Sequence, residues 1–200
     1  METLNPTPPL RSVCVFCASS PLASAARLQM AAETGELLAR AGLRLVYGGG
    51  SLGLMGACAR AARAAGGEVL GVIPRFLMEA EPPLADIDTV VVGSMHERKM
   101  LMFEQSDAFA VLPGAIGTLE EVIEVISWRR LGLHDKPIVF LDPDGYWKPL
   151  FDLFAAFGRE RLTPPDFGRC WSVVENAADL LPAIQQTSTT GSEARVERLS

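Results

Sequence analysis

Residues 47–56 read YGGGSLGLMG, and this glycine-rich stretch decides the fold. An apolar run rich in strand-forming residues ends at Tyr47, and an alanine-rich helical pattern runs from about Leu54 to Gly66. Glycines allow a tight turn and a close approach of the backbone to a ligand, and amide groups at a helix start suit an anion. A strand, a glycine loop and a helix in this order predict one unit of a parallel α/β sheet.

The same alternation continues along the chain. Strand-like runs occupy residues 12–16, 43–47, 68–73, 89–92, 108–112, 137–141 and 171–174, with helical patterns between them. Pro21 suits the first position of the first helix. This alternation predicts a single Rossmann-like, doubly wound α/β domain of about seven mostly parallel strands with helices on both faces. In such a fold, ligands are expected to bind beyond the carboxyl ends of the strands. Residues 1–10 and 185–200 are interpreted as flexible tails, and residues 11–184 as the domain.

Composition excludes several classes of function. The chain has 200 residues, a net charge of −6, 48% hydrophobic residues and a mean hydropathy of +0.21. No basic cluster suits a nucleic-acid backbone, and no apolar run reaches the roughly 18 residues of a membrane span. The first ten residues lack a basic, apolar export signal, so we expect a cytoplasmic protein.

Cysteine and histidine usage points to packing. Four cysteines are too few for a disulfide scaffold in a chain of this length. Cys14 and Cys17 lie in one strand-like run that points them to opposite faces, so we expect buried packing cysteines. His96 and His134 have no second ligand at metal spacing, so no bound metal is expected.

The first glycine loop contains a literal G-x-G-x-x-G at Gly48, Gly50 and Gly53. A dinucleotide site also needs an acidic residue about 20 residues later, at the end of the next strand, and none stands there. A Walker loop is excluded because no Lys-Ser/Thr pair follows the glycines. No cofactor is therefore expected, and Gly49 and Gly50 remain candidates for holding a phosphate.

A second loop, residues 112–121 (LPGAIGTLEE), also joins a strand to a helix. Thr118 and Glu121 have the spacing of a helix capping box. In the helix that follows, the expected core stripe consists of Leu119, Val122, Ile123 and Ile126. Glu121, Val125 and Trp128 share another side, which predicts a second buried surface that is either a partner subunit or a pocket wall.

Six motifs, in order, carry a resemblance to a known family. They are FCASS (16–20), YGGGSLGLMG (47–56), GVIP (71–74), MHERK (95–99), PGAIGTLEE (113–121) and GLHDKP (132–137). Together they resemble the lonely guy family, which consists of cytokinin riboside 5'-monophosphate phosphoribohydrolases often labelled lysine decarboxylase-like. The resemblance covers residues 13–150 and implies hydrolysis of the N-glycosidic bond of such a nucleotide or of AMP, releasing free base and ribose 5-phosphate.

The resemblance also implies site residues. Arg98 and Glu121 match the catalytic pair. The matched substrate contacts are Glu81, Arg98, Lys99, Ala115, Ile116, Gly117, Thr118, Leu119, Glu120, Glu121 and Ser127. We expect the substrate phosphate on the amides of Gly117 and Thr118, at the start of a helix. The decarboxylase label implies pyridoxal phosphate, but none of the three lysines has a persuasive Schiff-base setting.

Three positions depart from the family pattern: Ala18 replaces a glycine in the first motif, and the other two lie in the second loop. Ala115 replaces a glycine and Ile116 an aromatic residue. If position 115 requires a positive φ, alanine costs on the order of 1 kcal/mol and shifts the loop. The preference between cytokinin nucleotides and AMP therefore stays open.

Two other readings remain. The same loops fit a non-catalytic carrier or sensor of a nucleotide or phosphate-bearing cofactor. Alternatively, the Glu121, Val125 and Trp128 face is only a dimer surface. Under the leading reading the expected ligand is a small-molecule nucleoside 5'-monophosphate, and we expect a homodimer formed through that helix face.

Overall fold

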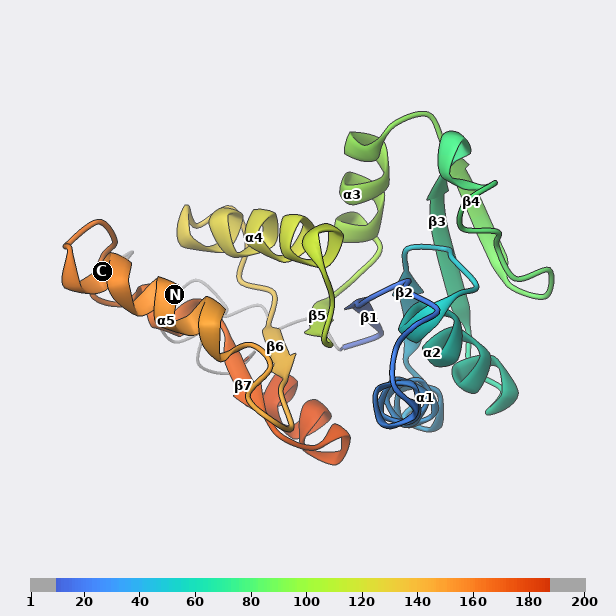
Figure 1. Cartoon of the computed structure of the whole chain (residues 1–200), viewed down its shortest axis with the longest axis horizontal. Helices are drawn as coiled ribbons and strands as arrows, with labels where there is room; N and C mark the ends of the chain where they lie inside the picture. The colour runs from blue at the N-terminus through green and yellow to red at the C-terminus, as the bar shows by residue number, and fades with distance from the viewer. Residues whose placement is uncertain (1–9, 188–200) are drawn as a thin grey trace, which may run out of the picture.

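A seven-stranded parallel sheet forms the centre of the protein (Figure 1). The computed structural model describes residues 10–187. In chain order the strands are β1 (Ser12–Phe16), β2 (Arg44–Tyr47), β3 (Val69–Pro74), β4 (Asp88–Val92), β5 (Ala108–Val111), β6 (Ile138–Leu141) and β7 (Ser172–Val174). Every pairing between neighbouring strands is parallel. The predicted Rossmann-like fold is confirmed.

The strand order is β4-β3-β2-β1-β5-β6-β7. From β1 the chain builds outward through β2 and β3 to β4, and it then returns to the centre to place β5 on the other side of β1. In doubly wound sheets the connections on the two sides of such a reversal lead away from each other. In proteins with such sheets, ligands bind at this reversal, beyond the carboxyl ends of the two central strands.

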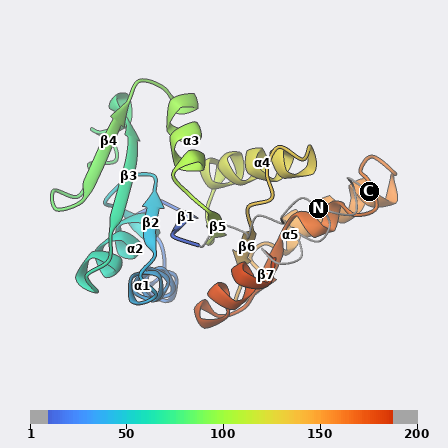
Figure 2. The ribbon, with the colours of Figure 1, turned by 180° about the vertical axis from the view of Figure 1, so that it is seen from behind.

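Helices cover both faces of the sheet, as Figure 1 and the reverse view in Figure 2 show. One face packs on α1 (Ala25–Arg40), α2 (Gly53–Ala64) and the helical residues 180–187, which contribute Leu38, Ala59 and Leu180 to a fully buried cluster. The other face packs on α3 (Met95–Glu104), α4 (Ile116–Arg130) and α5 (Lys148–Arg159). Of these helices, α3 and α4 carry the catalytic candidates Arg98 and Glu121.

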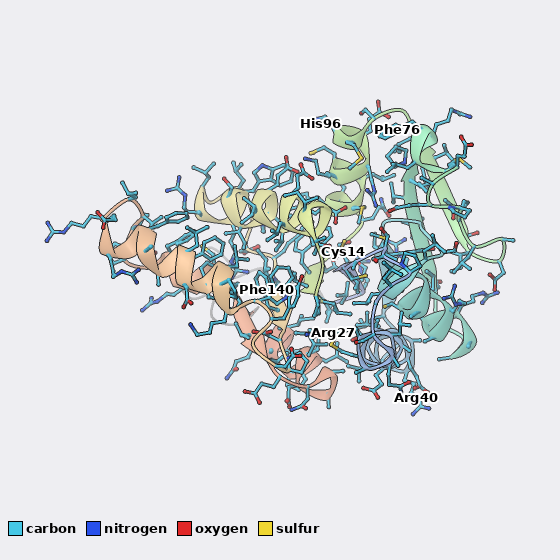
Figure 3. The ribbon with its side chains drawn as sticks, in the orientation of Figure 1. Cys14, Arg27, Arg40, Phe76, His96 and Phe140 are labelled. Carbon is cyan, nitrogen blue, oxygen red and sulfur yellow. The ribbon has the colours of Figure 1, made fainter. Side chains whose placement is uncertain are left out.

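The strand alternation predicted for the two nearby cysteines is confirmed. Cys14 and Cys17 are buried in the clusters on opposite faces of the sheet. Figure 3 labels Cys14 in the interior, between the helices. Burial raises the pKa of both thiols, as expected for packing cysteines.

The predicted helix starts were less accurate. Helix α1 begins at Ala25, after a Ser24 cap that accepts a hydrogen bond from the Arg27 amide, and not at Pro21. Helix α4 begins at Ile116 with Ala115 as its cap, so Thr118 lies inside the first turn and the predicted capping box is wrong. In both places several residues could serve as caps, and tertiary contacts decide among them.

The predicted tails lie largely outside the described residues, because residues 1–9 and 188–200 are not described. Within residues 10–187, no helix is both long and apolar enough to span a bilayer.

Candidate active site at the carboxyl ends of the central strands

Helix α3 delivers Arg98 to the carboxyl end of the sheet. Two hydrogen bonds cap its N-terminus. The Ser94 hydroxyl accepts a hydrogen bond from the Glu97 amide at 3.1 Å, and the Glu97 carboxylate accepts one from the Gly93 amide at 2.7 Å. This reciprocal arrangement resembles a capping box and fixes the first turn of α3. Arg98, the residue after Glu97, is thereby directed inward and is 4% exposed.

The Arg98 guanidinium joins β3 to the loop that follows β2. Its Nε donates to the carbonyl of Val72 in β3 at 3.2 Å, and its Nη2 donates to the carbonyl of Gly48, directly after β2, at 3.0 Å. Nη1 lies 3.9 Å from the Met95 sulfur and 3.6 Å from Glu121 Oε1. Since two of the three nitrogens are held by backbone, Arg98 presents mainly Nη1 to the site.

Gly48 is required by this arrangement. A Cβ atom at position 48 would lie 2.1 Å from Arg98 Nη2, far inside van der Waals contact. The first glycine of the 47–56 motif therefore makes room for a buried arginine.

Glu121 faces Arg98 from α4. It is 4% exposed, and its Oε1 is 3.6 Å from Arg98 Nη1. Burial raises the pKa of Glu121 from its ordinary 4.5 to about 7, although the Arg98 charge acts in the opposite direction. The carboxyl group can therefore exist in either protonation state near neutral pH, as is common for groups in active sites.

Lys99 is engaged by two carboxylates of α4. Its Nζ donates to Glu120 and lies 3.0 Å from Glu124. Burial alone would lower the pKa of Lys99, but the hydrogen bonds to these carboxylates raise it. The structure thus brings the predicted contacts Lys99 and Glu120 together, and it gives the lysine a role in joining α3 to α4.

The second loop leads into α4 with free amides. The first intrahelical bond runs from the Leu119 amide to the Ala115 carbonyl, so the amides of residues 116–118 have no acceptor within the helix. Ala115 has φ −98° and ψ −150°, an ordinary extended conformation. The condition for strain at Ala115, a positive φ, is therefore not met, and alanine is accommodated here without backbone strain.

Gly114 is the residue of this loop that must lack a side chain. A Cβ there would lie 2.1 Å from Thr118 Oγ1. Thr118 is 3% exposed and packs directly against the Gly114 backbone. The loop and the first turn of α4 thus form one compact unit.

The first glycine loop offers little to an anion. The amides of Leu54 and Met55, at the start of α2, donate to the Ala18 carbonyl at 2.9 and 3.2 Å. The Glu81 carboxylate packs beside Gly50, with Oε2 about 3.4 Å from where a Cβ would stand. A carboxylate at this place repels a phosphate, so the geometry favours the second loop over the candidates Gly49 and Gly50.

The face of α4 with Glu121, Val125 and Trp128 is covered by the same chain. Val125 is 4% exposed, and the Trp128 ring meets Phe103 of α3 edge-on, with centroids 5.1 Å apart. The burial of Glu121 and Val125 agrees with the alternative of a pocket wall, whereas Trp128 is only partly buried, and the partner contact predicted for this face stays a prediction. The predicted core stripe of α4 was partly wrong, because Val122 and Ile126 are buried but Ile123 is 40% exposed.

The outer face of α4 carries the remaining predicted contacts. Ile116 is 80% exposed, and Ser127 is exposed further along this face. Ser127 follows Glu121 by six residues, which turns it to the other side of the helix and moves it about 9 Å along the axis. Within one chain the structure does not bring Ser127 to the Arg98–Glu121 pair.

Sequence reasoning missed two partners of the site. The Val72 carbonyl holds Arg98, and the Tyr146 hydroxyl donates to the Gly114 carbonyl at 2.7 Å. A backbone carbonyl has no sequence signal. Tyr146 stands in a turn, and nothing in its local pattern points to a residue 32 positions earlier.

The three lysines of the chain do not fit a pyridoxal phosphate site. Lys99 is ion-paired, the Lys136 Nζ donates to the Phe103 carbonyl at 2.6 Å, and Lys148 forms an exposed pair with Asp152. A Schiff-base lysine needs an amine that reaches the pocket and can become neutral. Nor do residues 10–187 contain a group of three His, Cys, Asp or Glu side chains that could hold a metal ion.

Comparison with known proteins adds to this geometry. Residues 55–184 match the family described as "Possible lysine decarboxylase". The chain is 41% identical to the cytokinin riboside 5'-monophosphate phosphoribohydrolase LOG5 of Arabidopsis thaliana, over 88% of this chain and 77% of that protein. It is 45% identical to the Arabidopsis enzyme LOG3, over 78% of this chain and 73% of that protein.

Solved structures share the fold. The molybdenum cofactor carrier protein of Chlamydomonas reinhardtii superposes with a TM-score of 0.67 at 23% identity, covering 90% of this chain and 98% of the other. At this identity the likeness concerns the fold alone.

Proposed function

The chain belongs to the lysine decarboxylase-like family that includes the cytokinin riboside 5'-monophosphate phosphoribohydrolases, and from this premise we propose that it is an N-glycosidic hydrolase. The substrates are cytokinin riboside 5'-monophosphates, AMP or both, and the products are free base and ribose 5-phosphate. The observation that carries this proposal is the buried Arg98–Glu121 pair, which lies beside a helix start that suits a phosphate.

Glu121 acts on the ribose. Cleavage of a glycosidic bond passes through an oxocarbenium-like sugar, and a nearby carboxylate stabilises its positive charge, holds its hydroxyl groups or orients the attacking water. A carboxylate that is 4% exposed does this in a low-dielectric setting, where each charge interaction is stronger than in water. Because its pKa is about 7, the reactive carboxylate form grows as the pH rises through neutrality.

Arg98 acts as an orienting charge. An arginine stays protonated at any physiological pH, so it does not supply a proton to the leaving base. Its bonds to the Gly48 and Val72 carbonyls fix Nη1 at 3.6 Å from Glu121. This fixed charge orients the carboxylate and balances negative charge near the leaving base or the phosphate.

The phosphate binds at the N-terminus of α4. The amides of residues 116–118 have no intrahelical acceptor, and the helix dipole adds a partial positive charge there. The Thr118 side chain lies in the same turn and adds a hydroxyl donor. Glu81, Lys99 and Glu120 complete the proposed substrate contacts, with Lys99 held in place by its two carboxylates.

A product assay tests the proposal. Pure protein is incubated with isopentenyladenosine monophosphate and, separately, with AMP, and free base is measured by chromatography. We expect base from at least one of them, and the ratio of the two rates gives the base preference. No base from either nucleotide, with protein that is folded by circular dichroism, would refute the hydrolase.

Glu121→Gln is the matched variant, because it keeps the shape of the side chain and removes its charge. We expect turnover to fall by about 100-fold or more if Glu121 stabilises the charge of the transition state. Binding of an intact nucleotide by the wild type without turnover would instead indicate the carrier or sensor.

We also propose a homodimer in the cytoplasm. The outer face of α4 exposes Ile116 and Ile123, and Leu131 continues this stripe at 60% exposure. Ser127 lies on the same stripe, so a second copy packed there would cover Ser127 together with the apolar side chains. Sedimentation equilibrium tests this: the wild type should be a dimer and Ile123→Asp a monomer, and a monomeric wild type would refute it.

A further inference from the structure

Tyr146 joins three segments that are distant in sequence. It lies in the turn between β6 and α5, and its hydroxyl donates to the carbonyl of Gly114 in the loop between β5 and α4 at 2.7 Å. On its ring, the Arg27 guanidinium of α1 stacks at 5.2 Å from the centroid. Figure 3 labels Arg27 between α1 and the turn that leaves β6.

Arg27 is itself held in place. Its Nη2 lies 2.7 Å from each carboxylate oxygen of Asp144, two residues before Tyr146. The Arg27 side chain is 20% exposed, whereas that of Asp144 is 62% exposed. The guanidinium thus contacts the 142–146 turn through both the Asp144 carboxylate and the face of the Tyr146 ring, and these contacts limit the movement of that ring.

The hydrogen bond from Tyr146 to the Gly114 carbonyl affects the site because of where Gly114 lies in the loop. The Gly114 carbonyl belongs to the peptide unit that leads into Ala115, the cap of α4. Its orientation is coupled to that of the amides of residues 116–118, where the proposed phosphate binds. Within the site, the Gly114 backbone also packs on Thr118, so a rotation of this peptide would disturb the threonine.

We propose that Tyr146 is a positioning residue that holds the 113–118 loop ready for the substrate phosphate, with Arg27 acting through it. This inference rests on the proposed function only for the identity of the ligand. Tyr146 does not contact the reacting atoms, so it contributes to binding and leaves the chemical step nearly unchanged.

Tyr146→Phe tests this role because it removes the hydroxyl and keeps the ring under Arg27. Loss of one neutral hydrogen bond corresponds to about a fivefold change in affinity. We expect KM for the nucleoside monophosphate to rise about fivefold, with kcat within twofold of wild type. The dissociation constant of ribose 5-phosphate, measured by calorimetry, should rise by the same factor.

The chain offers a matched control in its second tyrosine. The Tyr47 hydroxyl is buried without a hydrogen-bond partner and faces the α1 and α2 side of the sheet. Tyr47→Phe should therefore leave KM and the ribose 5-phosphate affinity unchanged. A purely structural role for Tyr146 would instead lower the melting temperature without changing either constant at 25 °C.

Arg27→Met extends the test, since it keeps an unbranched apolar stem and removes the guanidinium. Alone it should raise KM about twofold. In the Tyr146→Phe background it should have no further effect, because the hydroxyl through which it acts is gone. Equal effects of Arg27→Met in both backgrounds would overturn the idea that it acts through Tyr146.

Two results separate this inference from the hydrolase proposal. If the wild type releases no base but Tyr146→Phe weakens ribose 5-phosphate binding as expected, the hydrolase fails and the positioning role stands. If base is released and Tyr146→Phe leaves both KM and the dissociation constant unchanged, the positioning role is refuted and the hydrolase stands.

Discussion

Replacing Glu121 by glutamine should change how the stability of the protein depends on pH. In the folded protein, burial raises the pKa of Glu121 to about 7, whereas in the unfolded chain it has its ordinary value of 4.5. Between these values the folded state binds more protons than the unfolded state, so stability falls as the pH rises. The stabilising contribution of the protonated carboxyl is complete below pH 4.5 and is lost as the pH passes 7.

The magnitude follows from the difference between the two pKa values. About 2.5 pKa units at 1.36 kcal/mol per unit give about 3 kcal/mol over the full window. Between pH 5 and pH 8 the wild type should lose about 2 to 3 kcal/mol relative to Glu121→Gln, which does not titrate. In a chain of this length that corresponds to roughly 5 to 10 °C in melting temperature.

Urea unfolding of both proteins at pH 5, 6, 7 and 8 measures this difference directly. Comparison with the variant cancels the titration of all other groups, provided that the two proteins unfold with the same m-value. Curves of stability against pH that run parallel for the two proteins would refute a pKa raised by burial. Curves that diverge in the opposite direction would show that the Arg98 charge dominates over burial at this carboxylate.

Other substitutions follow from the same contacts. Arg98→Met should destabilise by about 3 to 5 kcal/mol at pH 8 in urea unfolding, because it leaves a buried carboxylate without its partner; a loss below 1 kcal/mol would contradict this. Gly48→Ala should lower kcat at least tenfold in the product assay, since its Cβ would displace Arg98; activity equal to wild type would show that the arginine can move at no cost. Burial lowers the pKa of His134 to about 4, so the wild type should lose stability relative to His134→Asn as the pH falls from 6.5 to 4. Equal acid unfolding midpoints for the two proteins would contradict this burial effect.

The fold was predictable because its signals are local and repeated. Apolar runs rich in β-branched residues, each followed by a helical pattern, occur along the whole chain, and a parallel sheet is the arrangement that accommodates them. Gly66 follows the end of α2 with φ of +81°, as its position in the sequence indicated, and Gly42 follows the end of α1 in the same way with φ of +70°. The start of α1 was missed because Pro21 and Ser24 are both acceptable there.

The site was predictable only in part. The family motifs identify Arg98 and Glu121, and helical spacing indicates that Glu121 lies on a second buried side of α4. Spacing alone does not reveal what covers that side, and the structure shows that Phe103 of α3 meets Trp128 there. Whether Ala115 is strained could not be decided from the sequence for a related reason, since its φ of −98° depends on how the loop meets Thr118 and Gly114.

The sequence by itself determined the alternation of strands and helices and the glycines that turn the chain, since these depend on local conformation. It also determined the residue types of the proposed catalytic pair, since their chemistry is carried by each residue. Only the tertiary structure decided which groups meet. Arg98 reaches carbonyls 26 and 50 residues away, and Tyr146 holds a loop 32 residues before it. Such contacts arise when parallel strands end at one edge of a sheet, and the pKa of Glu121 follows from the burial that this assembly creates.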